Sequence, residues 1–272
     1  MLYRLVIAAF CTGGIIWSGF YYPSTNVKWF IYLSNWSFFF VTLYFICATI
    51  VTAIHYKNQL KQTQKGARDQ NKNENGIKME AAKADNETSS SNAKPRDSLV
   101  TGPVDGDSEV VFTGDDLEAS RATLMTWFHE ATWVIYNIAS VAAILVTISF
   151  WLLIYRTFRG GAGPISVIFH AINSIVMVGD TMLSSIPVRL FHFVYPMLYS
   201  IAYITFTVIY WVCGGTNSFG MPFIYPQTDY TGRPVLAAIS QVCLFFIGLP
   251  LCQSLLFGFF RLRVWIKTKY IK

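Results

Sequence analysis

The sequence predicts an all-α membrane protein: a bundle of six transmembrane helices with one long polar insert. Only 13% of the 272 residues are charged and 53% are hydrophobic, whereas a soluble globular domain carries about 25% charged residues. The charges are also concentrated, because 10 of the 21 Lys and Arg and 12 of the 15 Asp and Glu fall in residues 56–122. The rest of the chain has too few charges to stay in water. This composition excludes a soluble dinucleotide-dependent enzyme, a secreted disulfide scaffold and a soluble nucleic-acid-binding protein.

Six apolar stretches are long enough to cross a membrane, since a hydrocarbon core of about 30 Å requires about 20 residues of helix. They are residues 2–22, 29–55, 131–155, 164–186, 190–213 and 235–260. The first could be mistaken for a signal peptide. We expect it to be retained, because it ends in aromatic residues and Pro23 rather than in a small-residue cleavage site. The fourth is the weakest candidate, because Asp180 interrupts it.

The basic residues predict that both termini are cytoplasmic. With the N-terminus inside, 17 of the 21 Lys and Arg fall on the inner side and 4 on the outer side. Cytoplasmic segments of membrane proteins carry such an excess of positive charge. Residues 1–55 and 123–272 are therefore expected to form one membrane domain, with residues 56–122 as a cytoplasmic loop between helices two and three.

The polar loop, residues 56–122, is predicted to be disordered. It is rich in Asn, Gln, Lys, Glu and Ser and has almost no aromatic residues, so it cannot bury enough apolar area to offset the entropy of ordering. One interpretation is a regulatory tail with candidate phosphosites such as Ser98. The other is a variable linker, which the composition favours.

The polar residues inside the spans are the candidates for chemistry, because each costs free energy to place in a membrane. Ser34 and His170 each lie five or six residues inside the outer end of a span that runs inward. At about 1.5 Å per residue, both are expected about 8–9 Å deep, in one layer of the membrane. A serine activated by a histidine base is a workable hydrolase dyad.

Three residues are candidates to support that dyad. Asn35 or Asn173 is expected to donate a hydrogen bond to an oxyanion, and Asn35, Asn173 or Asp229 to orient the His170 ring. The alternative is that these polar side chains are hydrogen-bond links between helices, which the spacing alone favours. By contrast, Asp180 lies toward the cytoplasmic end, where we expect it to reach water or to pair with Arg189.

Other chemistry is not indicated. The five cysteines form no Cys-x-x-Cys pair or His/Cys cluster, and the sequence has no phosphate-binding loop or dinucleotide fingerprint. We therefore predict no metal and no cofactor.

Several motifs point to a known family. Residues 31–36 read IYLSNW, and further motifs follow: HAINS at 170–174, PxRxxHxxYP at 187–196, YxxFxxxYW at 203–211, GGT at 214–216 and IYPxxDY at 224–230. This combination resembles the rolling stone family of invertebrate membrane proteins. Ser34 stands where the family usually has Thr, and Tyr230 where Trp is expected. The family's N-terminal cytoplasmic segment has no counterpart, so we expect a short gene product or a truncated chain.

The resemblance implies two functions of different classes. The rolling stone family is associated with myoblast fusion, which implies a multi-pass plasma-membrane protein acting in cell–cell fusion. More distantly, the sequence is similar to the androgen-induced and androgen-dependent membrane hydrolases, which cleave fatty acid esters of hydroxy fatty acids with a Thr and a His. Ser34 and His170 match that pair. The expected partners are membrane lipids and, for the hydrolase, a lipid ester. No nucleic acid is expected, and the sequence names no protein partner.

Overall fold

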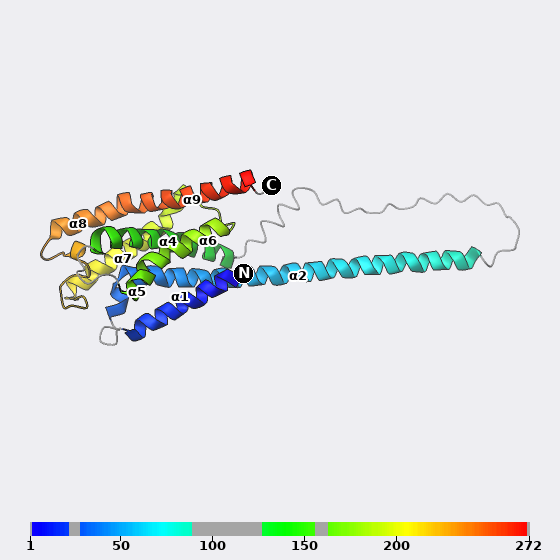
Figure 1. The fold of residues 1–272 in the computed structure, drawn as a ribbon, viewed down its shortest axis with the longest axis horizontal. Coiled ribbons are helices and arrows are strands. Elements are labelled where there is room, and N and C mark those ends of the chain that lie inside the picture. The colour runs from blue at the N-terminus through cyan, green and yellow to red at the C-terminus, as the bar shows by residue number, and fades with distance from the viewer. Residues whose placement is uncertain (1, 22–27, 89–126, 156–162, 271–272) are drawn as a thin grey trace. The chain divides into compact units, whose positions relative to one another are not determined.

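The computed structural model describes residues 2–21, 28–88, 127–155 and 163–270. Contacts divide the chain into two units, Met1–Val51 with Trp127–Lys272, and Thr52–Thr126. All regular elements in the described ranges are helices (Figure 1). The longer ones are α1 (Leu2–Tyr21), α2 (Leu33–Thr88), α4 (Trp127–Ser149), α6 (Asn173–Leu183), α7 (Val194–Val212), α8 (Pro234–Cys243) and α9 (Leu249–Tyr270).

Six helical stretches are long and apolar enough to span a membrane, as predicted. They are Leu2–Phe20, Leu33–Lys61, Trp127–Ile154, Pro164–Leu183, Leu190–Val212 and Pro234–Tyr270. The fourth combines the short α5 (Pro164–Val167), a π-helical segment (Ile168–Ile172) and α6, while the sixth combines α8, a π-helical segment (Leu244–Gly248) and α9. The protein is therefore a multi-pass, all-α membrane protein.

Helix α4 forms the centre of the bundle. Its residues from Ala139 to Val146 are buried without interruption, which a helix shows only when neighbours cover every face. Three alanines and Ser140 in this run let those neighbours approach closely, as small residues do between membrane helices. On the α2 side, the rings of Tyr44 and Tyr136 pack with their centroids 5.3 Å apart.

The outer faces of α7, α8 and α9 expose large apolar side chains, such as Leu198, Val242 and Leu251. A soluble protein rarely exposes so much contiguous apolar surface. These are the faces that the fold turns toward lipid.

The polar loop differs from its prediction over part of its length. The structure continues α2 to Thr88, so residues 56–88 are helical where the composition predicts disorder. Lys, Gln, Glu and Ala have high helix propensities, and extending an existing helix avoids the cost of nucleating a new one. Residues 89–122 and the candidate phosphosite Ser98 lie outside the described residues.

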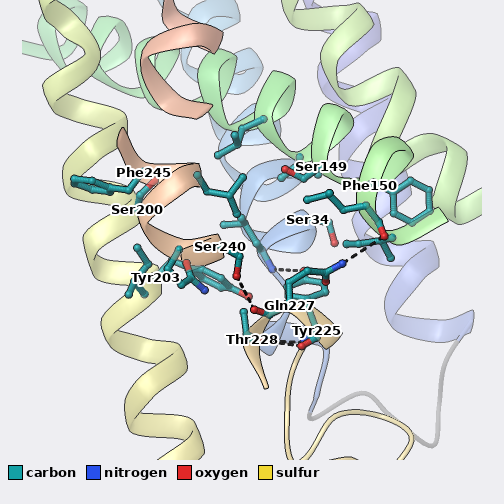
Figure 2. Close-up of a pocket in the computed structure, with 18 of the residues that line it drawn as sticks. Ser34, Ser149, Phe150, Ser200, Tyr203, Tyr225, Gln227, Thr228, Ser240 and Phe245 are labelled. Atoms are coloured by element: carbon teal, nitrogen blue, oxygen red, sulfur yellow. Dashed lines mark hydrogen bonds between the residues drawn. The ribbon is translucent and has the colours of Figure 1, made fainter. Parts of the chain in front are cut away.

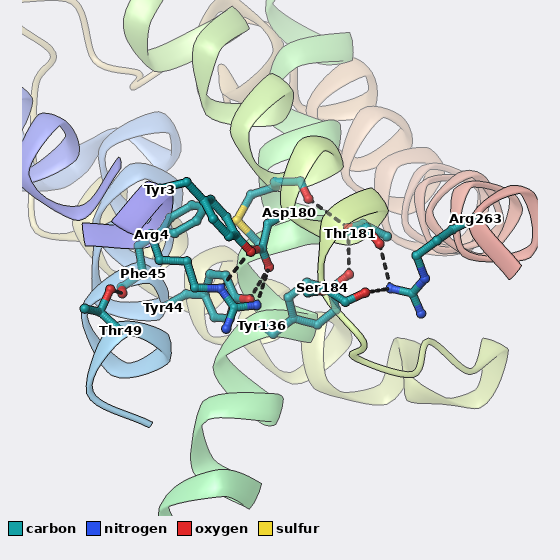
Figure 3. A network of polar contacts seen from close by, with 11 residues as sticks. Tyr3, Arg4, Tyr44, Phe45, Thr49, Tyr136, Asp180, Thr181, Ser184 and Arg263 are labelled. Carbon is teal, nitrogen blue, oxygen red and sulfur yellow. Dashed lines mark hydrogen bonds and ion pairs between the residues drawn. The ribbon is translucent and has the colours of Figure 1, made fainter. Parts of the chain in front are cut away.

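Asp180 has a partner that the sequence did not indicate. It is 1% exposed, and its carboxylate pairs with Arg4 of α1. The same carboxylate accepts hydrogen bonds from the hydroxyls of Tyr3, at 2.7 Å, and Tyr44 (Figure 3). The predicted pairing with Arg189 is wrong, since Arg189 is exposed and α1 brings the cation instead. A partner 176 positions away along the chain leaves no local signal.

Arg263 is a second buried charge at this network. It is 5% exposed, and its guanidinium donates to the carbonyls of Thr181 (2.7 Å) and Ser184 (Figure 3). It also donates to the carbonyl of Ile186 at 3.0 Å. These carbonyls lie at the C-terminal end of α6, where a helix lacks donors and favours positive charge. Arg263 therefore caps the C-terminal end of α6. In the sequence it looks like one more basic residue of the C-terminal tail.

Candidate functional site

A cavity of about 100 Å³ lies in the membrane bundle, between α2, the end of α4, α7, α8 and the loop that joins α7 to α8 (Figure 2). Space of this kind holds one water per about 10–15 Å³, so the cavity admits several waters or part of a lipid chain. Half of the residues that line it are Leu, Ile, Val and Phe and the other half are uncharged polar residues, and the surface that they present to the cavity is mostly apolar. The lining favours a ligand with apolar parts and neutral polar groups.

Three π-helical segments converge on this cavity. Phe150–Ile154 at the end of α4, Ile168–Ile172 before α6 and Leu244–Gly248 between α8 and α9 each contribute lining residues. A π turn contains an extra residue relative to an α turn, and such turns are found frequently at functional sites. The convergence of the three segments supports this cavity as the functional site.

Ser34 lies in the first turn of α2 and lines the cavity, with its residue 8% exposed. It belongs to a cluster of hydroxyl groups. The backbone N–H of Leu33 donates to the hydroxyl of Tyr225 at 2.9 Å, which satisfies one of the N–H groups that a helix start leaves free. The Tyr225 hydroxyl also interacts with the side chains of Ser34 and Tyr203.

His170 lies in the middle of the second π-helical segment and lines the same cavity. Its ring stacks on Phe150, with the centroids 3.7 Å apart and the planes 4° from parallel. Its backbone carbonyl accepts a hydrogen bond from the indole of Trp151 at 3.1 Å. The ring is thus fixed by stacking, while its Nδ1 is buried without a hydrogen-bond partner among the described residues. A ligand or a water in the cavity can supply that partner.

Ser34 and His170 are therefore neighbours of one cavity, as their equal depth suggested. In the described part of the chain, no hydrogen bond joins the two side chains. Catalytic hydrogen bonds in empty active sites are often long and tighten only when substrate binds. A Ser34–His170 pair without a hydrogen bond in the empty cavity is therefore compatible with a dyad.

The three supporting candidates lie outside the cavity lining. The Asn35 amide donates to the backbone of the turn before α2, at 2.6 Å. Asn173 donates to Ser37 at 3.1 Å and so links α6 to α2, as the alternative interpretation expected. Asp229 accepts the backbone N–H of Gly232 at 2.7 Å and closes a turn. The roles proposed for them at the dyad stay predictions.

The polar wall of the cavity comes instead from a segment that the sequence did not single out. Residues 225–228 form a turn in which Tyr225 and Thr228 bond to each other through backbone and hydroxyl groups. Ser240 of α8 donates to the carbonyl of Gln227 at 2.8 Å, and the Gln227 amide donates to the carbonyl of Leu153 at 3.4 Å. The only sequence signal was the IYPxxDY motif, which contains Tyr225.

The described residues contain no group of three or more His, Cys, Asp or Glu side chains positioned to hold a metal ion. The polar side chains in the described lining of the cavity carry hydroxyl, amide and imidazole groups.

Comparison with known families identifies the chain. The family described as "Rost: Protein rolling stone" matches residues 106–271, which is more than half of the sequence. The chain belongs to the rolling stone family. Within that family, the Protein rolling stone of Drosophila melanogaster is 30% identical over 161 residues, covering 54% of this chain and 57% of the relative. This chain thus aligns with a little over half of that relative's length. No solved structure matches.

The rolling stone match covers only part of the candidate site. Residues 106–271 include His170, Tyr225 and all three π-helical segments, whereas Ser34 lies before the matched region. Family membership therefore covers most of the cavity wall but does not extend to the candidate nucleophile.

Proposed function

We propose that this rolling stone family member is an intramembrane hydrolase of lipid esters, with Ser34 as the nucleophile and His170 as the base. The observation that carries the proposal is that Ser34 and His170 line one mostly apolar cavity within the bundle, whose described lining residues are all uncharged. Hydrogen-bond links between helices need no cavity. A hydrolytic site requires one to admit the substrate.

The chemistry follows the general path of a hydroxyl nucleophile. His170 takes the proton of Ser34, and the Ser34 oxygen attacks the ester carbonyl carbon. The alcohol then leaves with the proton from His170, and an acyl-enzyme remains on Ser34. A water, deprotonated by His170 in turn, releases the fatty acid and restores the hydroxyl. Stacking on Phe150 holds the imidazole in one plane through both steps.

The nature of the lining limits the substrate. Among the residues that the structure describes, no Lys, Arg, Asp or Glu lines the cavity, so a charged head group finds no partner in that lining. An ester bond between two apolar chains fits the mixture of apolar and neutral polar residues. Fatty acid esters of hydroxy fatty acids, the substrates of the hydrolases that the sequence resembles, contain such a bond, with their free carboxylate left outside the cavity.

The deciding experiment is labelling of the detergent-solubilised full chain with a fluorophosphonate probe. We expect the wild type to be labelled, and Ser34→Ala and His170→Ala to lose the label. Thr42→Val is the matched control, because Thr42 is a buried hydroxyl of the same helix that bonds to the carbonyl of Phe38 away from the cavity. An unlabelled wild type, or a label that survives both changes, contradicts the hydrolase.

A second proposal is a role at the plasma membrane in myoblast or other cell–cell fusion. What supports it is membership of the rolling stone family. Depletion of the protein in a fusing tissue should reduce the number of nuclei per fused cell, and the wild-type chain should restore it. Unchanged fusion after depletion argues against this role. Rescue by Ser34→Ala would separate the fusion role from the hydrolase.

A further inference from the structure

Tyr225 contacts the candidate nucleophile more directly than any group that the sequence suggested. It lies in the loop between α7 and α8 and lines the cavity. The Tyr225 backbone is fixed at both polar atoms, because its N–H donates to the Thr228 hydroxyl at 3.1 Å and its carbonyl accepts the N–H of Thr228 at 2.9 Å. Its ring packs edge-on against Tyr32, with the centroids 5.8 Å apart. The phenol is therefore held at a defined position next to Ser34.

The hydrogen bonds around Tyr225 leave its own hydroxyl proton available to a partner. The Tyr225 oxygen accepts the N–H of Leu33, and the Tyr203 hydroxyl gives its proton to the carbonyl of Ile31 at 2.8 Å. Ser34 and Tyr225 interact with each other and hold two hydroxyl protons between them. When Ser34 donates to Tyr225, the Tyr225 proton can go either to the Tyr203 oxygen, with which Tyr225 also interacts, or to a group in the cavity that Tyr225 lines.

The surroundings keep the Tyr225 hydroxyl protonated and polarise it. Burial raises the pKa of Tyr225 to about 12, so the phenol keeps its proton at neutral pH. A hydroxyl that accepts a backbone N–H is polarised and donates more strongly in turn. The start of α2, at Leu33, also contributes the positive end of the helix dipole.

We propose that the Tyr225 hydroxyl donates the hydrogen bond that holds the ester carbonyl oxygen of the substrate. This inference rests on the proposed hydrolase function. When the Ser34 oxygen bonds to the carbonyl carbon, the electron pair of the C=O π bond moves to the carbonyl oxygen, and His170 takes the Ser34 proton. The Tyr225 O–H then stabilises that oxyanion. Asn35 and Asn173, the donors first considered, have their amides committed to other partners.

The test is steady-state hydrolysis of a p-nitrophenyl fatty acid ester by the full chain in detergent. Removing one oxyanion donor lowers kcat by about 10²–10³-fold. We expect Tyr225→Phe to lose kcat on this scale while KM changes little. Tyr230→Phe is the control, because Tyr230 belongs to the same loop but bonds to Thr207 and does not line the cavity. It should keep the wild-type kcat.

A second variant separates donation from a structural role, since Tyr225 also caps α2. Replacing Tyr225 with 3-fluorotyrosine keeps the shape and makes the hydroxyl a stronger donor but a weaker acceptor. If Tyr225 stabilises the oxyanion, the fluorinated protein keeps or raises kcat. If Tyr225 only accepts the Leu33 N–H, the fluorinated protein loses kcat and thermal stability together, which overturns the proposal.

The outcomes also distinguish this inference from the proposed function. Hydrolysis that depends on Ser34 but stays within about tenfold of wild type in Tyr225→Phe overturns the role of Tyr225 and leaves the hydrolase standing. A wild-type chain that is neither labelled by the fluorophosphonate nor active on the ester overturns both.

Discussion

The guanidinium of Arg4 and the carboxylate of Asp180 form an ion pair, with 3.0 Å between Nε and Oδ1, across 176 positions of the sequence. The pair ties α1, the first span, to α6. The Asp180 side chain is fully buried and that of Arg4 is 14% exposed, so water screens the pair little. The tyrosine hydroxyls around Asp180 satisfy its remaining lone pairs.

Removing one member of this pair should destabilise the bundle more than removing both. Breaking a buried pair by deleting one partner costs about 3–5 kcal/mol, because it leaves a buried charge uncompensated. We expect Arg4→Gln to lower the thermal unfolding temperature of the solubilised chain strongly. The double variant Arg4→Gln/Asp180→Asn should recover part of the loss. If the double variant is less stable than Arg4→Gln, the loss of stability in Arg4→Gln does not come from the unpaired charge of Asp180.

Arg263 should matter for stability where its neighbour Arg261 does not. Hydrogen bonds to a charged group contribute about 1.5–3 kcal/mol each, and Arg263→Gln removes the cation from the carbonyls at the end of α6. Arg261→Gln is the matched control, because Arg261 lies two positions earlier and is exposed. Thermal unfolding of both variants in the same detergent compares them, and equal unfolding temperatures would contradict the capping role.

Phe150 should act on catalysis through His170. Phe150→Leu removes the stacked ring and lets the imidazole turn, which we expect to lower kcat about tenfold with little change in KM. Phe246→Leu is the control, since Phe246 belongs to another π-helical segment but is 66% exposed on the outer face. A loss of kcat in both variants would point to general loosening of the bundle rather than to the ring.

Both termini are expected on the cytoplasmic side, and exposed cysteines can test this. Cys213 is exposed at the end of α7, which the orientation places outside. With the other four cysteines replaced by alanine, a membrane-impermeant maleimide should label Cys213 in intact cells. A cysteine introduced as Thr268→Cys, at an exposed position near the end of α9, should react only after permeabilisation. The reverse pattern would invert the orientation.

Sequence reasoning predicted the spans well, because a membrane requires about 20 apolar residues per helix whatever the protein. It also led us to expect Ser34 and His170 at similar depths, since depth follows from counting along a helix, and both residues line one cavity. The partner of Asp180 could not be predicted, because the depth of a residue does not tell which helices are neighbours. The position of Tyr225 at the cavity could not be predicted for a different reason. Tyr225 lies in a loop of about 20 residues, and such a loop can fold back over a bundle in many ways.

Unlike the spans, the π-helical segments have no signature in the sequence. A π turn forms where tertiary packing compensates for its poorer geometry, so periodicity along one helix cannot reveal it. Residues 150–154, 168–172 and 244–248 read as ordinary apolar helix in the sequence. The cavity that they surround therefore became visible only when the helices were placed together.

The convergence of these three turns has a consequence for how such a cavity can change. Because a π turn contains one residue more than an α turn, loss or gain of a single codon in one segment would convert a π turn to an α turn, or the reverse. Every lining residue beyond that point would then rotate by about 100°, the angle between successive residues of a helix. Relatives could thus acquire different substrate ranges through single-residue insertions and deletions. The wall residues would keep their identities but present different faces to the cavity.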